Sequence, residues 1–351
     1  MKTADFSYNL RPERIAQSPA EPRDSSRLLV LDRASGKISH AIFRDIEHFL
    51  QPGDLLVVND SKVFKARLRC VVGAHGNAPA PGEGVSPYAP TAIELFLLRP
   101  EGDYWLALAK PGRKIKVGAV LDFPDGQTAT VKEKRDDGTV VVDFKKSADE
   151  IFAWTDRIGE VPIPPYIDPN PSTLHSALST TYQTVYAKPR GSVAAPTAGF
   201  HFTPELIEKL KAQGINFATV TLHVGLGTFR PMKTDDVENH IMHEEWIDVP
   251  DATCSLIRDT RLRDGRVIAV GTTTVRSLES EVRHGFTKIF IKPGYKFKNI
   301  DALVTNFHLP KSTLLVLVSA FAGRDLIMKA YAEAIENNYR FYSFGDAMLI
   351  L

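Results

Sequence analysis

The chain has 351 residues, 43% of them hydrophobic, and a formal net charge of +1. This length and apolar content suit two or three domains with well-packed cores. The balanced charge argues against nucleic-acid binding by bulk charge alone, although it leaves room for a local basic patch. Cys70 and Cys254 follow no metal or disulfide spacing, and the most apolar run, Thr313 to Ala322, is shorter than the ~20 residues that a bilayer span needs. We therefore expect a reduced cytoplasmic protein that does not enter a membrane.

The N-terminal part combines short strands with a short helix. We expect a strand at Arg27 to Leu31, a helix at Phe43 to Leu50 and a buried strand at Asp54 to Val58. A continuous apolar run such as the last one is typical of a strand that is covered on both faces. This strand opens into a polar loop formed by Asn59, Asp60 and Ser61.

The segment Val63 to Val71 alternates sharply between apolar and charged residues. One face carries Phe64, Ala66, Leu68 and Cys70, and the other carries Lys65, Arg67 and Arg69. This period of two predicts a half-buried strand with a cationic outer face. Small barrels often hold nucleic-acid backbones, so the three cations are candidates for nucleic-acid binding, and a solvated strand face explains them equally well.

Short strands with turn signals between them continue along the next part of the chain. They are expected at Ile93–Leu98, Trp105–Ala109, Val120–Phe123, Thr128–Lys132 and Thr139–Phe144. This spacing predicts a small antiparallel β-barrel, which we place at residues 65–145. The interval 75–90 is crowded with Gly, Pro and Ala, and this composition indicates a flexible inserted loop.

From Tyr182 onward, strands alternate with helices. The strands are expected at Ile215–Val224, Arg266–Val270, Lys288–Ile291 and Ala302–Phe307, and the helices between Pro204 and Gly214 and at Asp251–Asp264, Val275–His284, Thr313–Phe321 and Asp325–Asn337. This pattern predicts an α/β main domain, residues 1–64 and 146–351, with a largely parallel or mixed sheet. The small antiparallel barrel is inserted into it.

The stretch Tyr182 to Pro204 is a long irregular segment that leads directly into a helix. Thr203 is a suitable N-cap for this helix, and Pro204 suits the first helical position. Long irregular segments are uncommon inside compact domains, and the free N–H groups of a helix start favour an anionic or polar ligand. We therefore interpret the stretch as part of a binding site. An ordered crossover between two domains is the alternative.

Four segments of the α/β part bring polar residues to strand ends or helix starts. They are the loop with Lys188, Arg190 and His201, and the runs Thr221–Phe229, Val270–Arg276 and Thr305–Ser312. Ligands in open α/β sheets bind beyond the carboxyl ends of the strands, so we expect these segments to contribute to one substrate site. The turn Thr272–Thr274 could hold a carboxylate or a phosphate, since N-capping accounts for one of its threonines but not for three.

Three of the ten histidines, His201, His223 and His308, lie beside Gly or Pro turns at predicted element ends. We infer that at least one of them contacts substrate. His240 and His243 can share a helix face, which leaves open a metal-dependent hydrolase, although this is not the zinc-protease signature and no third ligand is evident. A non-catalytic RNA-binding protein built on the barrel is a further alternative. The chain has no P-loop, no dinucleotide-binding fingerprint and no nucleophile elbow.

At these residues the sequence resembles a known family, the S-adenosylmethionine:tRNA ribosyltransferase-isomerases of queuosine biosynthesis. The similar blocks are Asp5–Pro12, Leu55–Val63, Tyr182–Pro204, Thr221–Arg230, Gly271–Arg276, Thr305–Ser312 and Phe341–Leu351. They follow one another along nearly the whole chain, so the resemblance is more specific than a short motif. The interval 75–90 departs from the family pattern and is interpreted as a lineage-specific insertion.

The resemblance implies an enzyme that transfers and isomerises the ribosyl group of S-adenosylmethionine onto 7-aminomethyl-7-deazaguanine at the wobble position of tRNA. The products would be epoxyqueuosine, adenine and methionine. S-adenosylmethionine is then a consumed substrate, and no cofactor or metal is expected. The resemblance also implies an α/β domain with an inserted β-barrel. We expect the partners to be this tRNA and S-adenosylmethionine, and the protein to be a cytoplasmic monomer.

The resemblance does not assign individual roles, so these rest on the chemistry that the reaction requires. A sulfonium acidifies its neighbouring C5′ hydrogen, which histidine is suited to remove, so His201, His223 and His308 are the catalytic candidates. A carboxylate needs N–H groups or a cation, and an unstacked base needs an aromatic platform. The substrate-binding candidates are Asn59, Asp60, Ser61, Arg190, Thr197, Gly199, Phe200, Gly225, Gly227, Thr228, Phe229, Thr272, Thr273, Thr274, Arg276 and Asn306.

Overall fold

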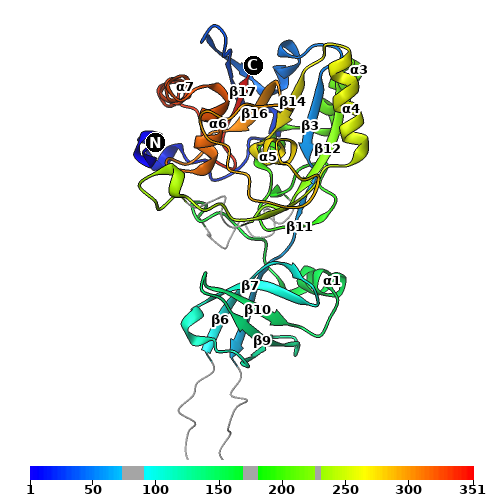
Figure 1. The fold of residues 1–351 in the computed structure, drawn as a ribbon, viewed down its shortest axis with the longest axis vertical. Coiled ribbons are helices and arrows are strands. Elements are labelled where there is room, and N and C mark those ends of the chain that lie inside the picture. Colours follow the sequence, from blue (N-terminus) through cyan, green and yellow to red (C-terminus); the bar gives the residue numbers. More distant parts are fainter. Residues whose placement is uncertain (73–90, 169–180, 226–230) are drawn as a thin grey trace, which may run out of the picture.

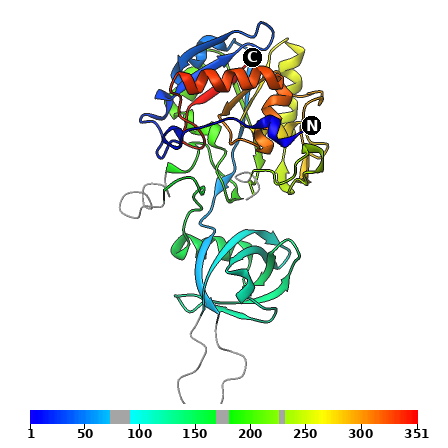
Figure 2. The same cartoon turned by 90° about the vertical axis from the view of Figure 1, so that its left-hand side faces the viewer.

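The structure is a computed structural model, and it describes residues 1–72, 91–168, 181–225 and 231–351. A larger α/β part, which contains both termini, and a smaller β-barrel lie end to end with a narrow junction between them (Figure 1, Figure 2). The chain enters the barrel after β4 (Lys62–Val63) and leaves it after α1 (Ala148–Ile158). The predicted combination of an α/β fold with a small inserted antiparallel barrel is confirmed.

The α/β part is built on a mixed sheet that has nine strands within the described residues. In order across the sheet they are β15 (His284–Thr287), β13 (Glu245–Asp248), β12 (Asn216–Leu222), β3 (Leu55–Asn59), β14 (Val267–Val270), β16 (Ala302–Asn306), β17 (Ala347–Ile350), β1 (Arg27–Leu31) and β2 (Ile38–Ile42). Strands β12, β3, β14 and β16 run parallel to one another, and β17 pairs antiparallel with β16. The carboxyl ends of four neighbouring strands therefore meet at one edge of the sheet.

Five α-helices accompany this sheet in the described part of the chain. They are α3 (Pro204–Ala212), α4 (Asp251–Leu262), α5 (Thr272–Leu278), α6 (Thr313–Ala322) and α7 (Arg324–Glu336). Helix α3 begins as predicted, because Thr203 Oγ1 accepts a hydrogen bond from Leu206 N at 3.1 Å. The helix expected at Phe43–Leu50 is a 3₁₀ helix over Phe43–Phe49. In the described ranges no helix is both long enough and apolar enough to cross a membrane.

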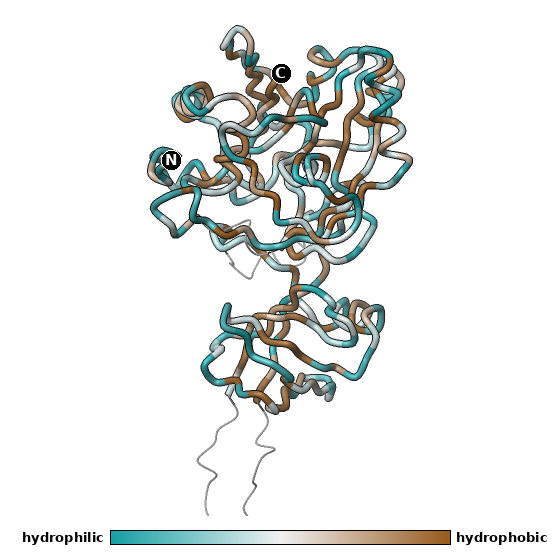
Figure 3. The backbone as a smooth tube through the Cα atoms, viewed as in Figure 1, coloured by the Kyte–Doolittle hydropathy of each residue, from teal (hydrophilic) through white to brown (hydrophobic). Residues whose placement is uncertain are grey.

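Strand β3 explains why a central strand reads as a continuous apolar run. Leu55 and Val57 pack into the core on one side of the sheet, together with residues of α6 and α7. Leu56 and Val58 pack into the core on the other side, together with residues of α3. Figure 3 shows the same distribution, with hydrophobic strands running through the middle of the α/β part. Both faces of β3 are buried, so no alternation is needed.

Six of the described strands close into the barrel. They are β5 (Arg67–Val72), β6 (Thr91–Glu101), β7 (Tyr104–Lys110), β8 (Val120–Asp122), β9 (Thr128–Lys134) and β10 (Thr139–Asp143). The alternation predicted for Val63 to Val71 is confirmed, because its four apolar side chains are at most 4% exposed and belong to the barrel core. Its three cations point outward. The predicted loop at 75–90 lies outside the described residues.

Helix α1 was not expected from the sequence. Its Ile151 and Trp154 are buried in the barrel core, and Trp154 Nε1 donates a hydrogen bond to Asp125 Oδ2 at 2.7 Å. A signal for the helix is nevertheless present, because Ser147 and Glu150 form a capping box. Ser147 Oγ accepts from Glu150 N at 3.3 Å, and Ser147 N donates to Glu150 Oε2 at 2.9 Å. The barrel core therefore continues beyond the last barrel strand.

The segment after α5 differs from the prediction. The helix expected over Val275–His284 is too long and the strand expected at Lys288–Ile291 is wrong, because α5 ends before Glu279 and β15 comes earlier. The Glu279 carboxylate accepts hydrogen bonds from the backbone N–H groups of Lys298 and Asn299, at 3.0 and 2.8 Å. Strand β15 pairs antiparallel with β13. These contacts between distant parts of the chain override the local helical pattern.

Two crossings hold the junction between the barrel and the α/β part. Strand β4 pairs in parallel with β11 (Arg190–Ser192). After α1, Glu160 and Arg67 exchange two backbone hydrogen bonds of 3.2 and 2.9 Å. A Cβ atom on the preceding Gly159 would lie 2.2 Å from the carbonyl oxygen of Lys65. This oxygen belongs to the backbone, so a side-chain rotation cannot make room.

We expect Gly159→Ala to lower the free energy of unfolding by about 1–3 kcal/mol, because the added methyl group pushes the two crossing segments apart. Thermal and urea unfolding would measure the change. Gly112→Ala is the matched control, since a Cβ there meets no atom within 4 Å. Equal melting temperatures for the two variants would contradict the prediction.

Candidate active site

A small cavity of about 60 Å³ lies at the carboxyl ends of β14 and β16. Each of the four segments that the sequence pointed to contributes to it, through Thr197, Val224, Thr272, Thr273, Asn306 and His308. The C-terminal part of the chain adds Tyr342 and Ser343. No charged side chain lines this strand-end cavity among the residues that the structure describes. The structure thus brings the predicted segments together at one place.

Among the described residues of the turn after β14, one threonine hydroxyl group is buried without a hydrogen-bond partner. Gly271 opens the turn with a φ of 91°, which glycine adopts readily, and its N–H donates to Val304 O at 2.8 Å. Thr274 Oγ1 donates to Val270 O at 2.7 Å and is thereby occupied. Thr273 Oγ1 is buried and has no hydrogen-bond partner in the described structure. A buried unpaired hydroxyl is costly, so Thr273 is the member of the turn best placed to meet a polar ligand atom.

Asn306 connects three segments around the strand-end cavity. Its Nδ2 donates to His201 Nε2 and to Tyr342 O, both at 3.2 Å. Its Oδ1 accepts a hydrogen bond from Thr197 Oγ1 at 3.3 Å. The side chain is buried. This one amide therefore links the end of β16 to the loop before α3 and to the C-terminal segment.

His201 lies next to this amide, and both of its ring nitrogens contact other side chains of the protein. Its Nε2 accepts from Asn306, and its Nδ1 lies 2.7 Å from Ser26 Oγ. Burial, together with the charges of Arg340 and Arg23, lowers the pKa of His201 to about 3. A side chain with both nitrogens occupied favours a structural role, and its catalytic role stays a prediction.

His308 is the one catalytic candidate that lines the strand-end cavity. Its Nε2 lies 2.7 Å from Thr305 Oγ1, and its backbone N–H donates to Tyr331 OH at 2.8 Å. The hydroxyl group of Tyr8 donates to its carbonyl oxygen. Burial lowers the pKa of His308 to about 3, so its imidazole is neutral at pH 7. A neutral imidazole whose backbone is held on both sides and whose Nε2 contacts Thr305 can accept a proton from a substrate in the cavity.

A second cavity, of about 540 Å³, lies between the barrel and the α/β part, and we call it the interdomain groove. Its barrel wall includes Leu98, Leu106, Leu108 and Phe152, and its α/β wall includes Arg190, His223, Trp246 and Phe286. Val224 lines both this groove and the strand-end cavity. The two cavities therefore adjoin at this residue.

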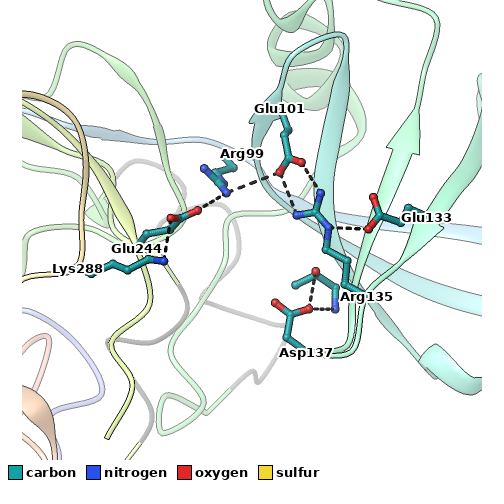
Figure 4. Close-up of polar contacts among 8 residues, drawn as sticks. Arg99, Glu101, Glu133, Arg135, Asp137, Glu244 and Lys288 are labelled. Carbon is teal, nitrogen blue, oxygen red and sulfur yellow. Dashed lines mark hydrogen bonds and ion pairs between the residues drawn. The ribbon is translucent and has the colours of Figure 1, made fainter.

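A chain of ion pairs crosses the interdomain groove (Figure 4). Arg99 Nη2 lies 2.8 Å from Glu244 Oε1, and Glu244 Oε2 lies 3.5 Å from Lys288 Nζ. On the barrel, Arg135 forms a two-bonded pair with Glu101. The cations on the barrel wall are thus neutralised by neighbouring carboxylates.

His223 belongs to the interdomain groove and not to the strand-end cavity. Its ring stacks on Trp246, with the ring centroids 5.1 Å apart and the planes at 17°. A Cβ on Gly191 would lie 2.6 Å from His223 Nε2, so only glycine leaves room for this ring. The Nδ1 atom is buried without a hydrogen-bond partner in the part of the chain that is described. Burial lowers the pKa of His223 to about 4.

Arg276, a candidate for holding a carboxylate, is already paired with Glu245. Both side chains are buried, and Glu245 Oε1 also accepts a hydrogen bond from Gly225 N at 2.9 Å. The Nε and Nη2 atoms of Arg276 have no partner among the described residues, so a ligand would have to use these two. Three further candidates, Gly227, Thr228 and Phe229, lie outside the described residues.

Other candidates bind mainly to the protein itself. The Asn59 side chain bonds to both backbone groups of Leu222, each at 3.0 Å, and Asp60 Oδ1 accepts from Thr221 Oγ1 at 2.7 Å. Burial raises the pKa of Asp60. Ser61 is fully buried. These three residues join the end of β3 to β12 and lie outside the lining of the strand-end cavity.

The candidates before α3 are tightly packed. Phe200 is 3% exposed and packs against Tyr182 and Phe344, so its ring is covered in this structure. A Cβ on Gly199 would lie 2.0 Å from Tyr186 OH, which explains the glycine by close packing. These contacts favour packing roles over direct substrate contact.

The three cations of the barrel strand each have an oxygen atom nearby. Lys65 Nζ donates to Asp156 O at 2.8 Å, Arg67 Nε lies 3.9 Å from Glu94 Oε2, and Arg69 Nε lies 3.1 Å from Glu160 Oε1. The partner of Lys65 is a neutral carbonyl group, so the charge of Lys65 is not cancelled by that contact. The charges of Arg67 and Arg69 are partly balanced.

The histidines that suggested a metal site do not meet a third ligand. Within the described residues no group of three or more His, Cys, Asp or Glu side chains could hold a metal ion. His240 packs against Phe290 with the ring centroids 5.7 Å apart, and His243 lines the interdomain groove.

Some lining residues were not expected from the sequence. Tyr342 and Ser343 reach the strand-end cavity because β17, which follows them, pairs antiparallel with β16. Trp246 reaches the interdomain groove because β13 pairs with β12. Both placements depend on strand order, for which a single sequence carries no local signal.

Comparison with known proteins places the chain in a family. The family model described as "Queuosine biosynthesis protein" matches residues 3–350. S-adenosylmethionine:tRNA ribosyltransferase-isomerases from Thermotoga maritima and Moorella thermoacetica are 51% and 49% identical to this chain, and each alignment covers all of both chains. A crystal structure of the S-adenosylmethionine tRNA ribosyltransferase from Thermotoga maritima has a TM-score of 0.54 and 41% identity, over 99% of this chain and 100% of that one. The chain therefore belongs to the family of queuosine biosynthesis proteins.

Proposed function

We propose that this chain carries out the reaction for which its relatives are named. It transfers and isomerises the ribosyl group of S-adenosylmethionine onto 7-aminomethyl-7-deazaguanine at the wobble position of tRNA, and it releases adenine and methionine. The observation that carries this proposal is the identity of about half of all residues over the full length of both chains. S-adenosylmethionine is consumed in this reaction, and the proposal includes no other cofactor.

The direct test is release of adenine from S-adenosylmethionine by the purified protein with tRNA that carries the aminomethyl base. We expect release that depends on both substrates and continues after treatment with a metal chelator. Release that stops on chelation would favour the metal-dependent alternative with His240 and His243. Binding of tRNA without any release would favour an RNA-binding protein that is not an enzyme.

The strand-end cavity suits one end of S-adenosylmethionine. Its lining carries no charged side chain in the described structure, so nothing there repels a sulfonium cation. Thr273 Oγ1 offers an unused hydroxyl group, and His308 offers a neutral imidazole. We assign Thr273 to a polar group of the substrate and His308 to removal of the C5′ proton beside the sulfonium.

His223 and the tRNA side of the reaction belong to the neighbouring groove. We assign His223, which lines this groove, to exchange of a proton with the second substrate, whose amine must lose one to attack the ribosyl carbon. His201 supports Asn306 from behind. We also infer that the protein acts as a cytoplasmic monomer. Sedimentation of the purified chain would test whether it is a monomer.

Replacement of single histidines separates these roles. We expect His308→Ala to lower turnover about 10²–10⁴-fold while the affinity for S-adenosylmethionine changes only a few fold, because a proton acceptor acts in the transition state. Exchange of the C5′ hydrogen with solvent should be lost with it. Melting temperatures measured alongside distinguish this outcome from a folding defect. His308→Ala with nearly normal turnover would refute the assignment.

His201 should instead control how stability depends on pH. Its pKa is about 3 in the folded chain, against about 6.5 in an unfolded one, so below pH 6.5 the unfolded state binds the extra proton. The free energy of unfolding is therefore not reduced by this histidine above pH 6.5, and it decreases as the pH falls from 6.5 towards 3. We expect His201→Gln to remove about 2 kcal/mol of the stability loss between pH 7 and pH 5. His284→Gln, at a side chain that is 72% exposed, is the control. Parallel pH profiles for the wild type and His201→Gln would contradict this.

The cationic face formed by Lys65 and by Arg67 and Arg69 of β5 is proposed to contact the tRNA backbone. We expect a smaller slope of log affinity against log salt in each of the variants Lys65→Ala, Arg67→Ala and Arg69→Ala. The slope should decrease by about one unit for every phosphate that the protein no longer neutralises. Because Arg67 and Arg69 have carboxylate partners, the Lys65 variant should show the clearest change. Titration of tRNA at several KCl concentrations measures the slopes. A triple variant with unchanged affinity and slope would exclude this face.

A further inference from the structure

We propose that the tRNA substrate lies with its phosphate backbone on three cations at the junction and inserts its target base into the interdomain groove. The three cations are Lys62, Lys188 and Arg190, and we call them the junction patch. This inference rests on the proposed function, because the partner it names is the RNA substrate of that function. It adds the place on the protein surface where the target base of the tRNA leaves the phosphate backbone.

The fold brings the junction patch together on two short segments. Lys62 and Arg190 are register partners in the parallel pair of β4 and β11. The backbone N–H of Lys62 donates to Pro189 O at 2.7 Å, and the backbone N–H of Lys188 donates to Asp60 O at 2.8 Å. The backbone positions of all three cations are therefore fixed by hydrogen bonds where the two parts of the protein meet.

The charges of the junction patch are only partly opposed, by Asp156 beside Arg190 and by the Coulomb attraction between Lys188 and Asp60. Neither Lys62 nor Lys188 forms an ion pair with a carboxylate in the described parts of the chain. Arg190 lies 2.7 Å from Asp156, but both side chains are about 40% exposed, so water weakens this pair and a phosphate can compete for Arg190. The carboxylate of Asp60 is 8% exposed and is held by Thr221. Three cations presented in this way suit a phosphate backbone.

The interdomain groove is balanced in charge within its described lining, where Arg99, Arg135 and Arg190 stand against Asp137, Glu244 and Glu245. Its barrel-side cations, Arg99 and Arg135, are paired with Glu244 and Glu101, and the carboxylate of Asp137 also faces the cavity (Figure 4). Hydrogen bonds from the side chain and the backbone of Thr139 lower the pKa of Asp137, which keeps it ionised. The groove interior therefore offers a phosphate group no surplus of positive charge. The carboxylates of Asp137 and Glu244 can instead pair with a protonated aminomethyl group on the base.

The size and the walls of the groove also suit a flipped-out base. A volume of about 540 Å³ lies within the usual range for small-molecule sites, roughly 300–1,000 Å³. Leu98, Leu106 and Phe152 offer an apolar barrel wall for the faces of a planar ring. Arg190 belongs both to the junction patch and to the groove lining, so it marks the point where the base leaves the backbone. Val224 then separates this base from the strand-end cavity.

The first test measures binding of tRNA carrying the aminomethyl base to the full chain at several KCl concentrations. We expect the variant K62A/K188A/R190A to flatten the slope of log affinity against log salt by about two to three units. The control K209A/K211A/K329A removes the same charge from α3 and α7, which lie at the far end of the α/β part from the barrel (Figure 1). It should keep the wild-type slope. A junction variant that melts at the wild-type temperature and keeps the wild-type slope overturns the proposal.

The second test addresses the base. Glu244→Gln removes a carboxylate charge from the groove wall, so it should reduce the preference for tRNA with the aminomethyl base over the same tRNA with guanine at that position. We expect this preference to fall several-fold while binding of the guanine-containing tRNA changes little. An unchanged preference would overturn the placement of the base.

Failure of this inference can be told apart from failure of the proposed function. Adenine release by the wild type tests the function and does not depend on where tRNA binds. Normal release together with an unchanged slope in K62A/K188A/R190A overturns the inference alone. Absence of release together with a flattened slope overturns the function and supports the RNA surface.

Discussion

The arrangement around the strand-end cavity depends on one buried amide. Asn306 ends β16 and holds His201, Thr197 and Tyr342 through hydrogen bonds of 3.2 to 3.3 Å. A buried amide with one bond missing would leave an unpaired polar group, so the network is stable only when all of its members are in place. The irregular loop before α3 and the C-terminal segment are far apart in sequence, and this amide fixes both beside the same strand end.

The barrel gives the site its second half. Without it the α/β part would still have its strand-end cavity, but His223 and Trp246 would face open solvent instead of the wall formed by β6, β7 and α1. The groove exists because the chain crosses the junction through β4 and returns through Gly159, where only glycine fits against the backbone. The close backbone packing at the junction therefore also determines the shape of the groove. Insertion of the barrel turns one small cavity into two adjoining ones.

Much of the fold could be predicted where the signal is local. The alternation along β5 and the capping residues Thr203 and Pro204 act over a few residues, and both predictions are confirmed. The predictions failed where distant contacts decide. Strand β15 forms because β13 is available beside it, and Glu279 ends the preceding helix by binding backbone groups near Lys298. Helix α1 lies between these cases, because its capping box is local while its apolar face is explained only by the barrel core that it covers.

The same distinction applies to the candidate site. The sequence pointed to segments that the structure brings together, since glycines and hydroxyl groups after apolar runs mark strand ends wherever the strands lie. It could not rank the three histidines, because each stands beside a turn. The three histidines differ in their contacts. Both ring nitrogens of His201 are hydrogen-bonded, and His308 lines the strand-end cavity. His223 lies at the interdomain groove, and its Nδ1 has no hydrogen-bond partner within the described structure. Such differences arise only when residues of different elements meet, as His201 does with Ser26 and Asn306 and His223 with Trp246.

Electrostatics connects these observations to the proposed chemistry. A sulfonium substrate carries positive charge on the sulfur atom bonded to the reacting C5′ carbon, so a protonated histidine there would oppose binding. Burial among uncharged groups lowers the pKa of His308 to about 3, which makes its neutral form the dominant one at pH 7. The same burial makes it a weak base. If His308 removes the C5′ proton as proposed, the step depends on the acidity that the sulfonium confers and on the position of His308 in the cavity lining, more than on the basicity of the imidazole. The uncharged lining that admits the cation also sets the protonation state of the residue that acts on it.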